Sequence, residues 1–246
     1  MESINLVGTL SDKQTARFDF ESIVPRRWEM VQACLQADFP EGDFRFLDLG
    51  GGNGLFADKL LEAYPRATGV LLDNSAPMLA KNTEHPRKEL ILDSVSNVAA
   101  HFEAGAFDVI FLNWVLHHLV GGSYGATVKN IQGALEICRS LLSPRGRLAV
   151  FENSYDGLVV DNLPSHLLFA LTTSRALARV MRPLGANSAG CGICPQSRRG
   201  WERLLHAAGL TVARLAVDGE KDTSRVKLFL LHCGSARVEL FWLAAA

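Results

Sequence analysis

The sequence predicts an α/β fold in which a doubly wound, largely parallel sheet of seven strands lies between helices. Two observations carry this prediction. Between residues 44 and 152, short apolar runs of strand length alternate regularly with segments that have the helical period. Near the end of the chain, the polar turn at 218–222 is too short to hold a crossover helix, so the last strand should be antiparallel to its neighbour.

Composition fits one large α/β domain, or a core domain with a modest appendage. The chain has 246 residues, 48% of them hydrophobic and 21% charged, with a formal net charge of -1. This balance gives no general reason to bind nucleic acid or an anionic membrane, so we expect neither partner, although a local basic patch would escape this test. The N-terminus lacks the features of a leader, and no apolar run is long enough to span a membrane, so a cytoplasmic protein is expected.

The N-terminal segment should form helices that cap the sheet. Residues 13–37 follow the helical period, and Pro25 should divide them into two helices because proline is tolerated only in the first turn. A turn then leads to the first strand, which ends at Asp48 and is followed by the glycine-rich loop 50–54 and a helix over 55–64. A loop so poor in side chains can hold a small polar ligand against bare backbone.

Four more strands and two more helices complete the regular part of the chain. The strands are predicted at 67–72, 89–92, 107–112 and 147–152, and the helices from Pro77 and over 128–142. Residues 95–106 are ambiguous. We expect the ends of these strands to form the ligand-binding edge of the sheet.

After residue 152 the alternation breaks. Residues 153–199 show no clear strand, have a helical stretch over 163–181, and carry five arginines against two acids, a local charge of +3. A helix over 199–208 and strands at 210–217 and 226–232 follow. The predicted organisation is therefore an N-terminal helical cap (1–43), a core (44–152), a helical lid or substrate insert (153–199) and the C-terminal part of the core sheet (200–246).

The stretch Asp48-Leu49-Gly50-Gly51-Gly52-Asn53-Gly54 resembles the first motif of the class I S-adenosylmethionine-dependent methyltransferases, an acid followed by alternating glycines. The resemblance continues through Asp73, Asp93-Ser94, the block 107–119 and the Pro-Arg-Gly turn within 141–150. A glycine loop alone would be weak support, because nicotinamide enzymes use a similar one. The acid before the glycines, the missing G-x-x-G helix start and the closing pair of strands separate the two, and the resemblance implies a Rossmann-like fold.

The resemblance also implies S-adenosylmethionine (SAM) as the cofactor. The residues that it assigns to the cofactor are Asp48, Gly50, Gly51, Gly52, Asp73, Asn74, Asp93, Ser94, Asn113 and Trp114. Asp48 would serve the amine of the methionine tail, Asp73 the ribose hydroxyls and Asp93 the adenine amino group. For Asp73 and Asp93 the alternative is a helix cap.

The acceptor side is less specified. His117 is the candidate base and Tyr155 the second catalytic candidate, because imidazole titrates near neutrality and Tyr155 follows the fifth strand. A structural role for the histidine pair, and an exposed turn at Tyr155, are the alternatives. Candidate substrate-binding residues are Phe18, Trp28, His118, Arg175 and Arg179, with Arg26 and Arg27 beside them in the cap. Arg175 and Arg179 would recognise an acidic substrate, or would form a solvated helical face.

Cys191 and Cys194 have the C-x-x-C spacing of half a zinc site, but no second pair follows, so no metal site is expected. A thiol pair in the lid, open to a thiol-seeking substrate such as arsenite, is the alternative. The predicted activity is methyl transfer from SAM to a small-molecule acceptor, with an acidic acceptor and secondary metabolism as finer hypotheses. The rival hypotheses are a protein or RNA methyltransferase and a non-catalytic cofactor-binding subunit, and the sequence leaves the acceptor atom and a homodimer open.

Overall fold

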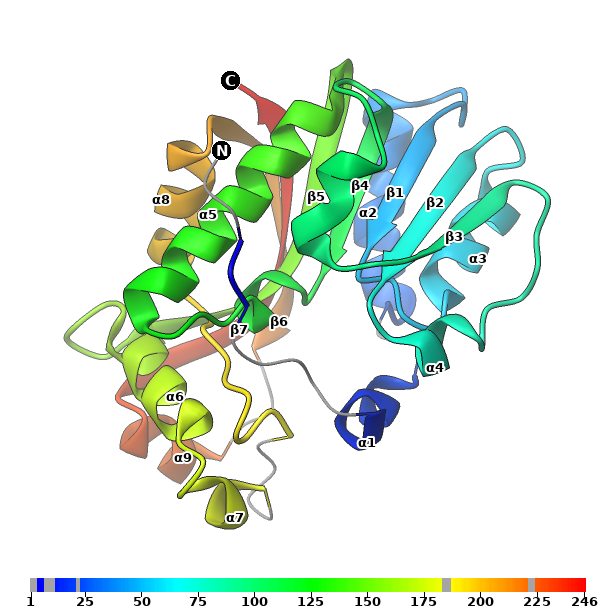
Figure 1. Ribbon diagram of the computed structural model, residues 1–246. Coiled ribbons are helices and arrows are strands. Elements are labelled where there is room, and N and C mark those ends of the chain that lie inside the picture. Colours follow the sequence, from blue (N-terminus) through cyan, green and yellow to red (C-terminus); the bar gives the residue numbers. More distant parts are fainter. Residues whose placement is uncertain (1–3, 7–11, 21–22, 183–186, 221–223) are drawn as a thin grey trace.

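The computed structural model describes residues 4–6, 12–20, 23–182, 187–220 and 224–246. These residues form a seven-stranded sheet in the order β3-β2-β1-β4-β5-β7-β6 (Figure 1). The pairs among β1 to β5 are parallel, and β7 is antiparallel to both β5 and β6, as predicted. The strands are β1 Arg45–Leu49, β2 Thr68–Asp73, β3 Lys88–Leu92, β4 Phe107–Asn113, β5 Leu142–Gly157, β6 Leu210–Glu220 and β7 Cys233–Ala245.

Helices cover both faces of this sheet. The helical elements are α1 Asp12–Thr15, η1 Ala16–Phe18, α2 Pro25–Asp38, α3 Leu55–Ala63, α4 Ala76–Leu79, η2 Val95–Ala100, η3 Leu116–His118, α5 Tyr124–Leu141, α6 Leu163–Thr173, α7 Ala178–Met181, α8 Arg198–Ala207 and α9 Arg225–Leu230. Pro25 stands in the first turn of α2, where its missing N–H costs nothing. None of the described helices is both long and apolar enough to cross a membrane.

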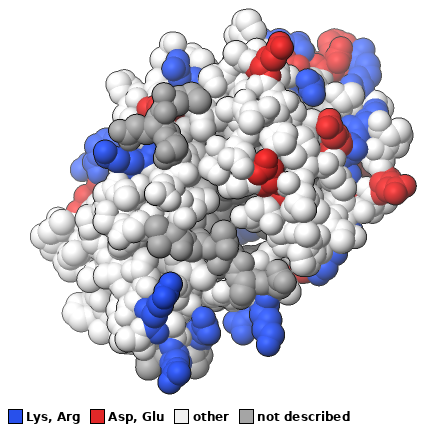
Figure 2. Space-filling view, viewed as in Figure 1, with Lys and Arg blue, Asp and Glu red and all other residues white. Residues whose placement is uncertain are grey.

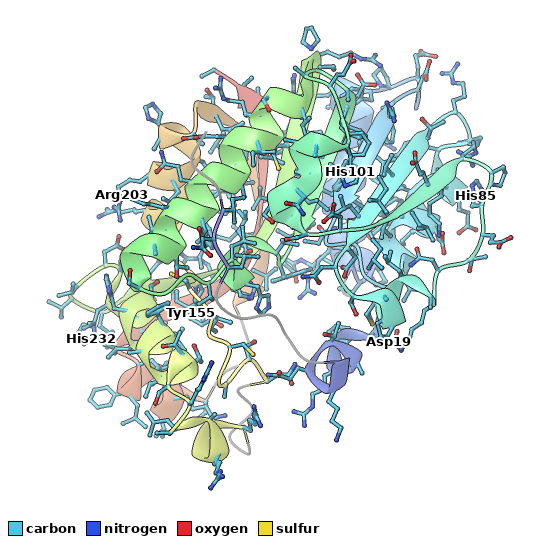
Figure 3. All side chains as sticks on the ribbon, in the orientation of Figure 1. Asp19, His85, His101, Tyr155, Arg203 and His232 are labelled. Carbon is cyan, nitrogen blue, oxygen red and sulfur yellow. The ribbon has the colours of Figure 1, made fainter. Side chains whose placement is uncertain are left out.

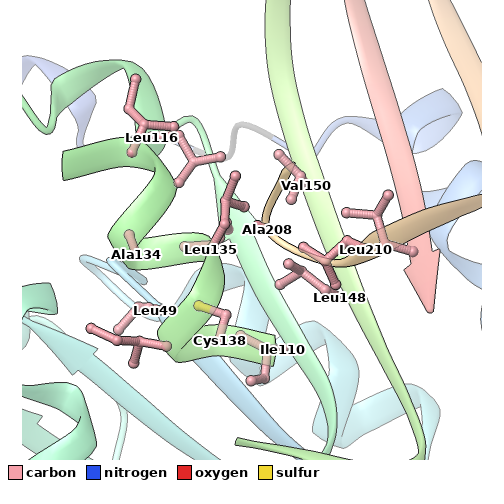
Figure 4. Packing of buried hydrophobic residues seen from close by; sticks show 14 of the residues in the cluster. Leu49, Ile110, Leu116, Ala134, Leu135, Cys138, Leu148, Val150, Ala208 and Leu210 are labelled. Atoms are coloured by element: carbon pink, nitrogen blue, oxygen red, sulfur yellow. The ribbon is translucent and has the colours of Figure 1, made fainter. Parts of the chain in front are cut away.

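Two apolar cores lie on the two faces. On one face, α5 and α8 pack against the sheet, and Figure 4 shows Leu135 and Cys138 of α5 beside Ile110 and Leu148 of β4 and β5. On the other face, α2 and α3 pack against the opposite side chains of the same strands. The central strands β1, β2 and β4 are therefore buried on both faces, which explains why they are apolar runs without alternation.

Three sequence predictions differ from the structure in this part of the chain. Residues 153–199 were expected to contain no clear strand, but β5 continues to Gly157 because β7 pairs with it from Leu148 to Gly157. The seventh strand was expected at 226–232, but those residues contain α9, and the strand begins at Cys233. The apolar run at 226–232 suggested a buried strand, but Phe229 and Leu230 are 74% and 72% exposed and belong to neither core. The predicted helix over 163–181 is interrupted between α6 and α7.

The topology fixes where a ligand can bind. From β1 the chain builds outward through β2 to β3, and it then returns to β4 on the other side of β1. The connections therefore leave the carboxyl ends of β1 and β4 in opposite directions and open a crevice between them. Asp48 and Asn113 stand at these two strand ends.

Candidate active site

A cavity of about 510 Å³ lies in this crevice, within the usual size range of small-molecule sites. Nine of the ten residues predicted to bind the cofactor line it; they are Asp48, Gly50, Gly51, Gly52, Asp73, Asn74, Ser94, Asn113 and Trp114. His117, His118, Asn153 and Cys191 line it too. The structure thus brings together strand ends and loops that are far apart in the sequence.

The glycine loop needs its glycines. Gly50 has a φ of 78°, and a Cβ there would lie 2.6 Å from Cγ2 of Val115. A Cβ on Gly51 would lie 2.5 Å from Oδ2 of Asp48. Real Cβ atoms do not approach this closely, so side chains are excluded and the backbone itself forms the wall of the cavity.

Asp48 is the most unusual charge in the site. It is 1% exposed, and its Oδ2 has no hydrogen-bond partner in the described part of the chain. Its Oδ1 lies 3.5 Å from Nδ2 of Asn113, whose own Oδ1 is also buried without a described partner. The pKa of Asp48 is raised to about 7; burial is the main cause, the charge of Asp73 adds to the rise, and Asn113 and Lys88 oppose it. Two unsatisfied buried acceptors at one point require a donor, and an ammonium group such as that of the SAM methionine tail fits them.

Asp73 ties the loop to the second strand. Its Oδ2 accepts from the Gly52 N–H at 2.9 Å, and its Oδ1 accepts from the Ser75 N–H at 2.8 Å. Burial raises the pKa of Asp73, and the backbone hydrogen bonds oppose that rise. Each carboxylate oxygen keeps a lone pair beyond these bonds, so Asp73 has acceptors left for a hydroxyl-bearing ligand in the cavity.

Asp93 is placed differently. It accepts hydrogen bonds from the Ser94 N–H and the Asn97 side chain, and it lies 2.7 Å from Nε2 of His101 (labelled in Figure 3). These partners hold the pKa of Asp93 below its ordinary value. Among the described residues that line the cavity, Asp93 is absent while Ser94 is present. The N-cap of η2 is Ser94, whose side chain accepts from the Ser96 N–H, and contact of Asp93 with adenine stays a prediction.

A second polar centre lies beyond the glycine loop. His117 Nδ1 is 2.6 Å from Oε2 of Glu152, the His117 N–H points to Oε1 at 3.3 Å, and both side chains are buried. A carboxylate at this position favours the tautomer with the proton on Nδ1 and leaves Nε2 with its lone pair. The His118 ring lies beside that of His117, tilted by 40° with 4.1 Å between ring centroids, and burial lowers the pKa of His118 well below the ordinary value.

Sequence reasoning missed Glu152. It closes the predicted fifth strand, 35 residues beyond His117, and an acid that ends a central strand at the ligand-binding edge was the available signal. The hydrogen bond to Glu152 fixes the orientation of the His117 ring. The role of His117 as a base stays a prediction.

The cap contributes one cation to the cavity. Arg27 lines it, the guanidinium carbon lies 5.1 Å from the centroid of the Trp114 ring, and Nε donates to Asp218 at 2.6 Å. Trp114 has a φ of 57° and stacks on Phe151, which fixes it at the end of β4. Arg27 is the one Lys or Arg among the described lining residues.

The other predicted acceptor residues lie elsewhere. Trp28, Tyr155, Arg175 and Arg179 do not line the cavity as far as the chain is described. Tyr155 was expected just past the fifth strand, but it lies within β5 opposite Ala236 (Figure 3). Arg175 and Arg179 are exposed at and before α7. The side chain of Phe18 lies outside the described part of the structure.

The segment around Cys191 reaches the site nonetheless. Cys191 and Gly192 line the cavity, and the Cys194 N–H donates to the His117 carbonyl at 2.8 Å. Cys194 is fully buried, and burial raises its thiol pKa to about 11. Within the described residues, no group of three or more His, Cys, Asp or Glu side chains is placed to hold a metal ion.

The strand order, the glycine loop after β1 and the acids at the ends of β1 and β2 together define a class I SAM-dependent methyltransferase fold. Comparison with known proteins agrees. Residues 47–148 match the family model described as "Methyltransferase domain". A SAM-dependent methyltransferase from Leishmania major has a TM-score of 0.61 over 93% of this chain and 76% of its own, at 18% identity.

Two curated relatives share parts of the sequence. The malonyl-[acyl-carrier protein] O-methyltransferase of Legionella pneumophila is 40% identical over 75 residues, 30% of this chain and 26% of that protein. The ubiquinone/menaquinone biosynthesis C-methyltransferase UbiE of Agrobacterium fabrum is 28% identical over 160 residues, 61% of this chain and 58% of that protein. Residues 47–148 therefore match a methyltransferase domain, and the fold is that of the class I SAM-dependent methyltransferases. Since the chain spans only a quarter to three fifths of these relatives, their acceptors are not transferred to it.

Proposed function

We propose that this protein transfers the methyl group of SAM to a small-molecule nucleophile. One observation carries the proposal: a single cavity is lined by an unsatisfied buried carboxylate, Asp48, beside the glycine loop and by His117 beyond it, and the buried carboxylate of Glu152 contacts His117. The first centre suits the cationic amine of the methyl donor, and the second suits removal of a proton from the acceptor.

SAM supplies a methyl group already activated by its sulfonium. The acceptor lone pair forms the new bond to the methyl carbon as the sulfur–carbon bond breaks, and S-adenosylhomocysteine leaves. His117 takes the acceptor proton at Nε2, and Glu152 stabilises the resulting imidazolium. Asp48 and Asn113 hold the amine, and the buried walls exclude water, so the protein contributes mainly alignment.

The acceptor class is supported by the relatives, whose names give small-molecule or carrier-bound substrates. The hypothesis of an acidic acceptor is not supported by Arg175 and Arg179, because neither lines the cavity. It depends instead on Arg27, which lines the cavity and donates a hydrogen bond to Asp218. A place in secondary metabolism stays a prediction.

Transfer of labelled methyl from SAM to panels of phenols, quinols and carboxylic acids tests the proposal. We expect label in at least one small molecule with the wild-type protein, and much less label at limiting SAM with Asp48→Asn. Calorimetric titration with S-adenosylhomocysteine gives the cofactor result separately. Label entering only RNA or protein would overturn the acceptor class, and absence of cofactor binding would overturn the proposal as a whole.

A further inference from the structure

Two segments bring large apolar side chains to one exposed surface. Leu158, Val159 and Val160 follow β5, while Val226, Phe229 and Leu230 belong to α9; together they form what we call the apolar patch. Their exposed fractions are 54%, 86%, 57%, 67%, 74% and 72%. The Leu158 N–H donates to the carbonyl of His232 at 2.9 Å, and Gly157 pairs with Cys233, so the segments are neighbours.

This clustering is not an even scatter over the surface. Eight large apolar side chains in the described residues are more than half exposed, and six of them form the apolar patch; the other two are Phe20 and Leu92. Single exposed apolar residues are normal in soluble proteins, but a contiguous group marks a binding surface. The apolar patch therefore needs a partner.

Two basic residues accompany the apolar patch on α9. Arg225 and Lys227 are exposed on α9 between the apolar residues, and α9 carries no acid. The acids that flank the 158–160 loop already have partners, since Asp156 pairs with Arg237 and Asp161 accepts from Ser197. Figure 2 shows basic side chains along the lower edge of the view, where α7 lies in Figure 1, while most of the visible acids gather at the upper right.

These features select the partner. A second copy bound through the same surface would place Arg225 and Lys227 of each copy near those of the other, and like charges repel. The apolar side chains project from a loop tip and a short helix instead of lining a groove, so they offer no pocket for a protein anchor. A fluid, anionic surface accepts projecting apolar side chains and basic residues together.

We propose that the apolar patch inserts into the surface of an anionic lipid bilayer, with Arg225 and Lys227 at the phosphate level. The protein then lies on the membrane without crossing it. The expectation of no membrane partner came from the net charge of the whole chain, which a local cluster of six exposed apolar side chains does not alter. This binding does not depend on the proposed methyl transfer.

Co-sedimentation with vesicles tests the inference. Wild-type protein should bind vesicles of equal parts phosphatidylcholine and phosphatidylserine, should bind phosphatidylcholine alone more weakly, and should be released by salt. The pair Val159→Ser and Phe229→Ser should abolish binding. Neutralising Arg225→Gln and Lys227→Gln should weaken it roughly thirtyfold. Leu92→Ser, equally apolar and exposed but outside the apolar patch, should bind as wild type.

All variants carry exposed substitutions, so melting temperatures should stay near the wild-type value and confirm folding. Wild-type protein that ignores anionic vesicles would overturn the proposal, as would patch variants that bind them unchanged. Sedimentation velocity supplies the remaining outcome. A wild-type dimer that the Val159 and Phe229 substitutions dissociate would show that a second copy, not a bilayer, covers the apolar patch.

Discussion

Replacing Asp48 by asparagine should make the protein more stable and its cofactor binding weaker. The carboxylate is 1% exposed and one oxygen has no described partner, so its charge is costly in the absence of ligand. At about 1.36 kcal/mol per pKa unit, a rise from 3.8 to about 7 corresponds to about 4 kcal/mol against the ionised form. The amide has the same shape and no charge, so Asp48→Asn should recover part of this free energy at pH 8.

The sign of the pH dependence follows from the raised pKa. The cost is fully present above pH 7, where Asp48 is ionised in the folded protein, and it declines as the pH falls from about 7 towards 3.8, the ordinary value. The stability gain of Asp48→Asn should therefore be large at pH 8 and small near pH 4. Chemical denaturation at both values measures it.

Cofactor binding should move the opposite way. Loss of a charge-assisted bond to an ammonium group costs about 1.5–3 kcal/mol, so the Kd for SAM should rise roughly ten- to a hundredfold in calorimetric titration. Asp43→Asn, an exposed acid away from the cavity, is the matched control and should change neither quantity. A variant that is less stable than wild type at pH 8 and binds SAM equally well would refute this reasoning.

Three further predictions concern the same cavity. Gly51→Ala should lower the free energy of unfolding by about 1–3 kcal/mol and weaken SAM binding, since the new Cβ would meet Asp48; Gly125→Ala, which meets nothing within 4 Å, should do neither. Glu152→Gln should lower kcat by about 10²–10⁴ with the SAM Kd unchanged, and an unchanged kcat would favour a structural role for His117. The wild-type SAM Kd should rise as pH falls below about 7, and this dependence should vanish in Asp48→Asn.

The cofactor half of the cavity was predictable from sequence because its information is local. Asp48 and the glycines lie within a few residues of one another, and Asp73 ends the next strand. The order of strand, loop and helix alone therefore brings them together at the carboxyl edge of the sheet. Asn113 follows from the same rule at the end of β4. Parallel strands align their carboxyl ends whatever the loops between them do.

The acceptor half was less predictable because its contacts are non-local. The arginine-rich composition of the insert pointed to Arg175 and Arg179. Charge alone does not predict whether a helical side chain faces the cavity or the solvent, and both side chains are exposed to solvent. Arg27 entered the cavity from α2, far away in the sequence, where Asp218 of β6 and the Trp114 ring position it. Only the folded chain shows which arginine faces the site.

The buried end of the insert explains how the acceptor half keeps its shape. Gln196 is 3% exposed, its side chain bonds to Ser165 and to the Cys194 carbonyl, and Asn162 donates to it at 2.9 Å. Buried amides of this kind are costly to uncouple, because each broken bond leaves an unsatisfied group in a dry interior. Since Cys194 in turn donates to the His117 carbonyl, the same contacts that anchor the insert hold the histidine over the cavity. Changes in acceptor specificity should therefore arise more readily at the cavity-lining positions Cys191 and Gly192 than within this buried network.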